Sequence, residues 1–172
     1  MAGCWPLRNP RRDRAGYCGT VSAQNLETLQ RYHERLNETG EPPVDLFHPD
    51  IEIHMFRGSP ISGPYRGHDG LRQWRQDAFD VIEEWRLELD EVITGDDPDV
   101  MVAIQRFVGR MKHTDLVANF PLAVVVRFRD RVIVRFEGYR ERNEALDAAG
   151  LGSNEKRTGR QGLEGGGTAP AY

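Results

Sequence analysis

Residues 123–151 read AVVVRFRDRVIVRFEGYRERNEALDAAGL and carry the strongest local structural signals in the chain. Two apolar runs meet at Arg129-Asp130-Arg131, a pattern that predicts two antiparallel strands joined by a tight turn. A short helical segment follows, and Gly150 stands where a helix C-terminus favours a left-handed residue. The segment therefore predicts a hairpin closed by a short helix.

The second of these strands ends in alternating charged and aromatic side chains. Arg135, Glu137 and Tyr139 lie two residues apart, so all three share one face of the strand. A guanidinium, a carboxylate and a phenol on one face form either a solvated edge or one wall of a chemical pocket. The direction of this face therefore bears directly on function.

Outward from this segment, hydrophobic periodicity predicts two longer helices and three more strands. The first helix, over residues 22–38, has His33 on its polar side and an apolar stripe formed by Leu26, Leu29, Tyr32 and Leu36. The stripe of the second helix, over residues 69–84, comprises Leu71, Trp74, Ala78, Phe79, Ile82 and Trp85. Strands are expected at 51–55, 87–93, 100–111, 116–128 and 132–139, the last four as an antiparallel run.

Length and composition favour one soluble domain between polar tails. The chain has 172 residues, and we expect residues 21–151 to fold while residues 1–20 and 152–172 stay disordered. The native start could even lie near Val21. Cys4 and Cys18 both fall in the first tail, where they are interpreted as inert reduced thiols.

The charge pattern argues against two classes of partner. The net charge is −4 and no predicted element carries a basic stripe, so a nucleic-acid partner is not expected. No apolar run approaches the length of about 20 residues that spans a bilayer, so no membrane association is expected either. The arginines near the N-terminus are not followed by an apolar segment, which speaks against a secretory signal and for a cytoplasmic protein.

Two strands are apolar at consecutive positions, over residues 100–104 and 122–126. A strand with one solvated face would alternate, so both faces of the sheet should be covered. The two main helices can cover only one face. A homodimer formed through the other face is therefore expected, the alternative being a monomer with an exposed apolar patch.

Four segments in order carry a resemblance to a known family. They are QRYHERLN (30–37), LFHPDIEIHM (46–55), GPYRGHDGLRQW (63–74) and RDRVIVRFEGYRERNEALDAAGL (129–151). Together they resemble the SnoaL-like family of the nuclear transport factor 2-like superfamily, which includes polyketide cyclases and has ketosteroid isomerases as relatives. The resemblance implies a cone-shaped α+β fold, in which a curved antiparallel sheet and helices enclose a ligand cavity.

The resemblance also suggests catalytic roles. Glu137 falls where epoxide hydrolase relatives carry a carboxylate base, which implies that its face points into the cone and that Glu137 acts as general base or acid. The alternative is an ion pair with Arg135 or a solvated edge. Tyr32 falls where the isomerases place an oxyanion-hole tyrosine, although it could merely fill core space. Tyr139 is the other candidate hydroxyl donor.

The chain departs from these relatives at most of their functional positions. Met55 and Val124 stand where the isomerases need two carboxyl groups, so steroid-type isomerisation is not expected. Ile53, Met55, Gln105 and Phe107 replace the polar groups of the epoxide hydrolases. What remains is an apolar cone lined by Ile53, Met55, Trp74, Met101, Phe107 and Val124, with Gln105, Arg135, Glu137 and Tyr139 as polar points. Such a cone fits a flat or hydrophobic ligand.

No metal or organic cofactor is expected. His48, Asp50, Glu52 and His54 alternate and could bind zinc or iron, but a solvated face explains them better. No Gly-rich phosphate loop occurs. The sequence thus predicts a protein that binds a small hydrophobic molecule and catalyses cofactor-free acid–base chemistry of cyclase, isomerase, dehydratase or hydrolase type. The alternative is a non-catalytic ligand-binding or dimeric assembly module on the same fold.

Overall fold

The structure, a computed structural model, describes residues 18–59, 61, 63–114 and 116–152. Its helices are α1 (Cys18–Thr39), the 3-10 turn η1 (Val44–Leu46), α2 (Gly67–Val81) and α3 (Arg142–Ala148). Its strands are β1 (Phe47–His54), β2 (Tyr65–Arg66), β3 (Ile82–Thr94), β4 (Val100–Met111), β5 (Val117–Arg129) and β6 (Val132–Tyr139). The expectations for residues 1–17, with Cys4, and for residues 153–172 lie outside the described residues.

The six strands form one open sheet in the order β2-β1-β6-β5-β4-β3. The strands β3 to β6 follow one another along the chain and pair antiparallel, which confirms the predicted four-stranded run. β1 adds parallel to β6, and the short β2 pairs antiparallel with β1. The first strand of the chain therefore lies beside the last one, which brings residues 47–54 next to residues 133–137.

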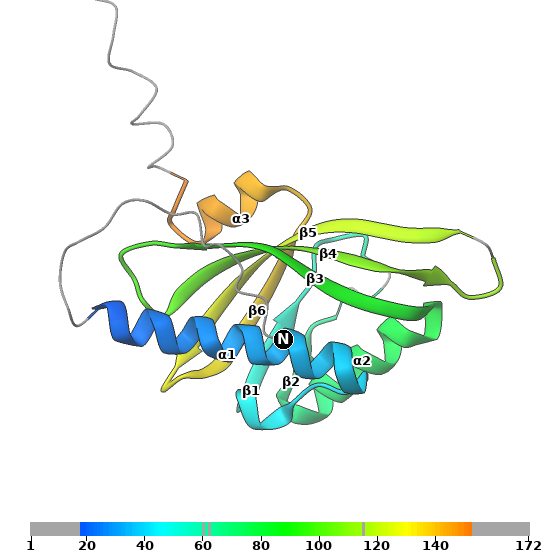
Figure 1. Ribbon diagram of the computed structural model, residues 1–172, viewed down its shortest axis with the longest axis horizontal. Coiled ribbons are helices and arrows are strands. Elements are labelled where there is room, and N and C mark those ends of the chain that lie inside the picture. Colours follow the sequence, from blue (N-terminus) through cyan, green and yellow to red (C-terminus); the bar gives the residue numbers. More distant parts are fainter. Residues whose placement is uncertain (1–17, 60, 62, 115, 153–172) are drawn as a thin grey trace, which may run out of the picture.

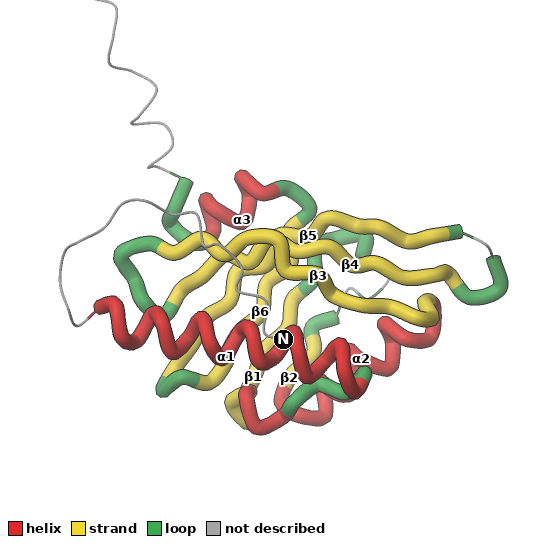
Figure 2. The backbone as a smooth tube through the Cα atoms, in the orientation of Figure 1, coloured by secondary structure: helices red, strands yellow, loops and turns green. Residues whose placement is uncertain are grey.

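Helices cover both faces of this sheet. In Figure 1, α1 and α2 lie on one side of the curved strands and α3 lies on the other, and Figure 2 shows how strongly the strands bend. The larger core lies against α1 and includes Leu29, Leu36, Ile53, Met101, Val124 and Val126. The smaller core lies against α3 and includes Val102, Ala123, Val125, Ala145 and Leu146. The consecutive apolar residues of β4 and β5 thus have partners within one chain, and the homodimer stays a prediction.

The hairpin between β5 and β6 forms as the sequence predicts. Arg129 pairs with Val132, so Asp130 and Arg131 form a two-residue loop. Both have positive φ, at 51° and 68°, as expected for a tight turn whose twist matches that of the strands. The backbone strain at these two positions is sustained by the pairing on either side.

The end of α3 also matches the expectation. Gly150 has a φ of 73°, the amide of Leu151 donates to the carbonyl of Leu146, and the amide of Gly150 donates to that of Asp147. This pair of hydrogen bonds defines a Schellman cap. The cap returns Leu151 to the smaller core, which holds α3 on the outer face of the sheet.

Four predicted boundaries are wrong. β1 begins at Phe47 rather than at residue 51, and β3 begins at Ile82 rather than at residue 87. α1 begins at Cys18, within the segment assigned to the tail. α2 ends at Val81, three residues early, because Ile82 and Glu83 pair with β4 and the chain turns into β3. Glu84 has a φ of 50° at the irregularity that follows, and Trp85 therefore lies on a strand rather than on the helical stripe.

None of the helices in the described ranges is both long and apolar enough to cross a membrane.

Candidate functional site

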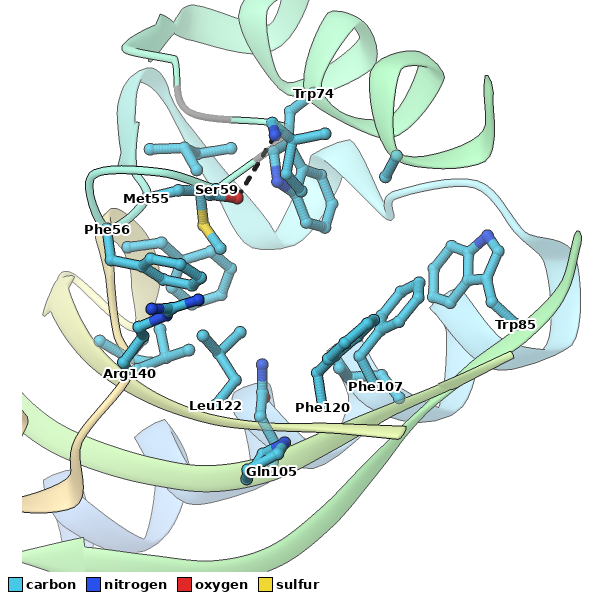
Figure 3. A pocket seen from close by; sticks show the side chains of 18 of the residues that line it. Met55, Phe56, Ser59, Trp74, Trp85, Gln105, Phe107, Phe120, Leu122 and Arg140 are labelled. Carbon is cyan, nitrogen blue, oxygen red and sulfur yellow. Dashed lines mark hydrogen bonds between the residues drawn. The ribbon is translucent and has the colours of Figure 1, made fainter. Parts of the chain in front are cut away.

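A cavity of about 470 Å³ lies between the concave face of the sheet and the helices α1 and α2. Figure 3 shows side chains from the sheet, from α2 and from the segment after β1 converging on it. It is lined by Leu29, Tyr32, Ile53, Met55, Phe56, Gly58, Ser59, Ile61, Trp74, Ala78, Ile82, Trp85, Leu87, Gln105, Phe107, Phe120, Pro121, Leu122, Val124, Val126, Phe136, Arg140 and Glu141. The wall is therefore mostly aliphatic and aromatic.

Aromatic side chains give the cavity flat, rigid walls. Trp85 and Phe107 stack with their ring centroids 5.2 Å apart at an interplanar angle of 25°. Phe56 lies under the guanidinium of Arg140, whose Cζ is 5.2 Å from the ring centroid. Figure 3 places the stacked pair and the Phe56–Arg140 pair on opposite sides of the cavity. This arrangement suits a flat apolar molecule.

Most of the lining residues predicted from the sequence do line this cavity. Ile53, Met55, Trp74, Gln105, Phe107 and Val124 all contribute to its wall, as does Tyr32. Met101 does not: it is fully buried in the larger core. The positions at which this chain differs from the isomerases and epoxide hydrolases thus surround the cavity, and they make it apolar.

The expected direction of Glu137 is wrong. Paired residues of antiparallel strands point to the same side of a sheet, and Glu137 pairs with Val125 while Tyr139 pairs with Ala123. Val125 and Ala123 belong to the smaller core under α3. Phe136, one residue before Glu137, lines the cavity. Arg135, Glu137 and Tyr139 therefore lie on the outer face of the sheet.

On that outer face Glu137 takes part in ion pairs. One of its carboxylate oxygens lies 2.9 Å from Nη2 of Arg135, and the other lies 3.6 Å from Nε of Arg127. Arg135 also lies 3.6 Å from Glu52. Burial, and then the nearby charge of Glu137, raises the pKa of the Tyr139 phenol. This is the ion-pair alternative left open by the sequence.

The alternating residues of β1 form pairs rather than a metal site. His48 lies 3.8 Å from Asp50, and His54 lies 3.3 Å from Glu52. The hydrogen bond from His54 lowers the pKa of Glu52, helped by the charges of nearby arginines. Across the part of the chain that the structure describes, no group of three or more His, Cys, Asp or Glu side chains is placed to hold a metal ion.

The main surprise at the site is His33, which is buried and not on the polar side of α1. Its Nδ1 lies 2.8 Å from the carbonyl oxygen of Leu29, and its Nε2 lies 2.9 Å from the carboxamide of Gln105. Burial lowers the pKa of His33, against the opposing effect of these two hydrogen bonds. Because α1 crosses a concave sheet, its buried stripe is wide enough to include His33 beside Tyr32.

Tyr32 is held at the cavity wall by ring contacts. Its ring centroid lies 5.4 Å from that of Phe47 and 5.3 Å from that of Phe136. Burial raises the pKa of its phenol far above the ordinary value, so the hydroxyl stays protonated. We find no hydrogen-bond partner for this hydroxyl among the described residues, and it can therefore donate to a bound molecule.

Other polar groups at the cavity were missed in the sequence. Ser59 lines it from the segment after β1, and the hydroxyl of Ser59 accepts a hydrogen bond from the amide of Ile61. The indole N–H of Trp74 is buried and has no hydrogen-bond partner within the described ranges. Arg140 and Glu141 line the cavity too, but both are exposed. Loop residues of this kind have no periodic signal that would assign them to a cavity.

These features define an α+β protein of the nuclear transport factor 2-like class, with a cavity between a curved sheet and its helices. Residues 29–136 match the SnoaL-like domain family. The chain belongs to this family, which includes cyclases and isomerases. No curated protein matches the chain.

Solved structures support the same fold. A nuclear transport factor 2-like protein of unknown function from Burkholderia pseudomallei shares 23% identity and a TM-score of 0.61, over 73% of this chain and 97% of that one. A protein with a ketosteroid isomerase-like fold from Catenulispora acidiphila, in complex with trimethylamine, shares 17% identity and a TM-score of 0.58, over 74% and 95%. Bal32a, from a soil-derived mobile gene cassette, shares 18% identity and a TM-score of 0.63, over 75% and 98%.

Proposed function

We propose that this protein binds a small, uncharged and largely apolar molecule in the cavity. The observation that carries the proposal is the composition of the wall, in which aromatic and aliphatic side chains surround a few uncharged polar groups, those of Tyr32, Ser59, Trp74 and Gln105. A charged ligand would lose its hydration without gaining a buried counter-ion. Among the described lining residues, the charged side chains are those of Arg140 and Glu141, and both are exposed.

A cavity-filling variant tests this function. Leu122 lines the cavity from β5, and Leu122→Trp places an indole in the space that a ligand would occupy. We expect 2-naphthol, measured by isothermal titration calorimetry, to bind the wild-type protein and to lose at least about tenfold in affinity in this variant. Arg129→Trp adds the same ring at the exposed far end of the same strand and serves as the matched control.

Equal affinity in both variants would place the probe outside the cavity and overturn the proposal. A second measurement uses no chosen probe. Native mass spectrometry of the protein as purified from its host is expected to show a small organic adduct in the wild type and none in Leu122→Trp.

A second candidate function is cofactor-free acid–base catalysis in the same cavity, favoured by the hydroxyl of Tyr32, which has no hydrogen-bond partner among the described residues. A neutral phenol can donate to the oxygen of a carbonyl compound as it becomes an enolate. Glu141 is the one carboxylate among the described lining residues, and would take the proton from carbon. Exchange of the α-protons of 2-tetralone for deuterium, followed by NMR, measures this activity. Exchange in the presence of the wild-type protein that is no faster than in buffer would contradict the catalytic function and leave ligand binding as the proposed function.

We further propose that the protein forms a homodimer. Leu116, Val117 and Phe120 are exposed by 67%, 72% and 56% at the start of β5, where the β4–β5 hairpin projects from the body in Figure 1. Val117 and Phe120 point to opposite faces of the strand, so the hairpin presents apolar side chains on both faces. Such a group of large apolar side chains is typical of an interaction surface. Sedimentation equilibrium is expected to give twice the monomer mass, and a monomer mass would contradict the proposal.

A further inference from the structure

The pair formed by His33 and Gln105 determines which polar atom the cavity offers to a ligand. His33 is 5% exposed and Gln105 is 6% exposed, so the contact between them is shielded from bulk water. The Nδ1 atom of His33 lies 2.8 Å from the carbonyl oxygen of Leu29. A carbonyl oxygen can only accept a hydrogen bond, so Nδ1 must carry a proton.

The other ring nitrogen then acts as an acceptor. Both polar contacts of His33 are with uncharged groups, and a charged imidazolium in this buried position would have no counter-ion. A neutral imidazole carries one N–H, which is already used at Nδ1. The Nε2 atom therefore carries no proton and accepts through its lone pair. The carboxamide group of Gln105 that lies 2.9 Å away must donate to it.

The donor of the Gln105 carboxamide is its NH2 group. With the amide oxygen toward His33, two acceptors would face each other, and a half-turn of the carboxamide removes this conflict. The half-turn exchanges nitrogen for oxygen at the tip that rises into the cavity in Figure 3. The carbonyl oxygen then faces the ligand, and it can only accept.

We propose that His33 holds the Gln105 carboxamide with its carbonyl oxygen toward the cavity, so that the cavity selects apolar molecules carrying a hydrogen-bond donor, such as phenols and alcohols. This inference rests on the proposed function and specifies the ligand class. Gln105 is the residue that touches the ligand, and His33 is a positioning residue. The hydroxyl of Tyr32, on the same cavity wall, can donate to the oxygen of such a ligand.

A matched pair of probes tests the selection. 2-Naphthol and 2-methoxynaphthalene share one ring system, but only the first can donate a hydrogen bond. Calorimetric titration of the full chain is expected to give an affinity at least about tenfold higher for 2-naphthol, although the ether is the more apolar probe. In Gln105→Met, which keeps the length of the side chain, this preference should disappear while the ether still binds.

The variant His33→Phe separates positioning from contact. Without Nε2 as its partner, the carboxamide is free to turn either group toward the ligand. We therefore expect the affinity ratio of the two probes to fall through a gain by the ether, with Gln105 still in place. An unchanged ratio in His33→Phe would overturn the positioning role.

The outcomes separate this inference from the function on which it rests. Equal wild-type affinity for both probes would leave the binding function intact and overturn the donor selection. Binding of neither probe would count against the proposed function. The orientation of Gln105 would then be tested separately, through the tautomer of His33. Nitrogen chemical shifts of the imidazole should show a neutral ring protonated at Nδ1. A ring that is protonated at Nε2, or at both nitrogens at pH 7, would overturn it.

Discussion

The side chain of Asn37 binds the backbone of Leu87 through two hydrogen bonds. Its Nδ2 donates to the Leu87 carbonyl at 2.9 Å, and its Oδ1 accepts from the Leu87 amide at 2.8 Å. β3 is an edge strand, so the side-chain carboxamide of Asn37 occupies the place that a further strand would take. The contact attaches the last turns of α1 to the edge of the sheet, one turn beyond His33, and so holds α1 across the cavity.

Replacing Asn37 by alanine should therefore destabilise the protein. Asn37→Ala removes both hydrogen bonds but lets water reach the Leu87 backbone, so we expect a loss of about 1 kcal/mol in the free energy of unfolding. Urea denaturation measures the change. Glu38→Ala, at the exposed neighbouring position, is the control and should change stability by less than about 0.5 kcal/mol. Equal effects would show that the Asn37–Leu87 contact contributes nothing of its own.

His33 should make stability depend on pH. Its pKa is lowered in the folded protein, so the unfolded chain binds a proton more readily below the ordinary histidine pKa of about 6.5. The contribution of neutral His33 to the free energy of unfolding is therefore complete above that pH and is lost as the pH falls below it. We expect the urea midpoint of the wild type to drop between pH 7 and pH 5, and that of His33→Phe to drop less. Parallel curves would contradict the buried neutral histidine.

Tyr32→Phe should weaken binding without harming the fold. The ring contacts with Phe47 and Phe136 remain, whereas the hydroxyl that we propose as a donor to the ligand is lost. We expect the affinity for 2-naphthol to fall by about three- to tenfold, and the melting temperature to stay within a few degrees. Because burial raises the pKa of Tyr32, the contribution of its hydroxyl should be unchanged between pH 7 and pH 9. An affinity of Tyr32→Phe for 2-naphthol equal to that of the wild type would show that the hydroxyl does not contact the ligand.

Glu137→Gln should leave ligand binding unchanged. Glu137 lies on the outer face with Arg135 and Arg127, so its charge is not part of the cavity wall. We expect the affinity for 2-naphthol to stay within twofold of the wild type, in contrast to Gln105→Met. The partly exposed ion pair should contribute no more than about 1 kcal/mol to stability. A large loss of affinity would show that Glu137 contributes to the ligand-binding site.

Local sequence signals were sufficient for the hairpin at Asp130-Arg131, for the cap at Gly150 and for the class of fold. These features depend on backbone conformations that neighbouring residues decide among themselves. The family resemblance located six of the eight predicted ligand-contact residues on the cavity wall, because the order of the elements sets which strand positions face the cone. The apolar character of the cavity follows from those residue types alone.

The tertiary structure decided which face of each element points inward. Period-two alternation groups Arg135, Glu137 and Tyr139 on one side of β6, but it does not say which side meets α1. Both sides of this sheet are covered, by α1 and α2 on one face and by α3 on the other, so apolar residues mark neither face as unique. The burial of His33 likewise comes from the curvature of the sheet, which wraps a wider arc of α1 than a flat surface would. Its contact with Gln105, 72 residues away, exists only once that curvature has formed.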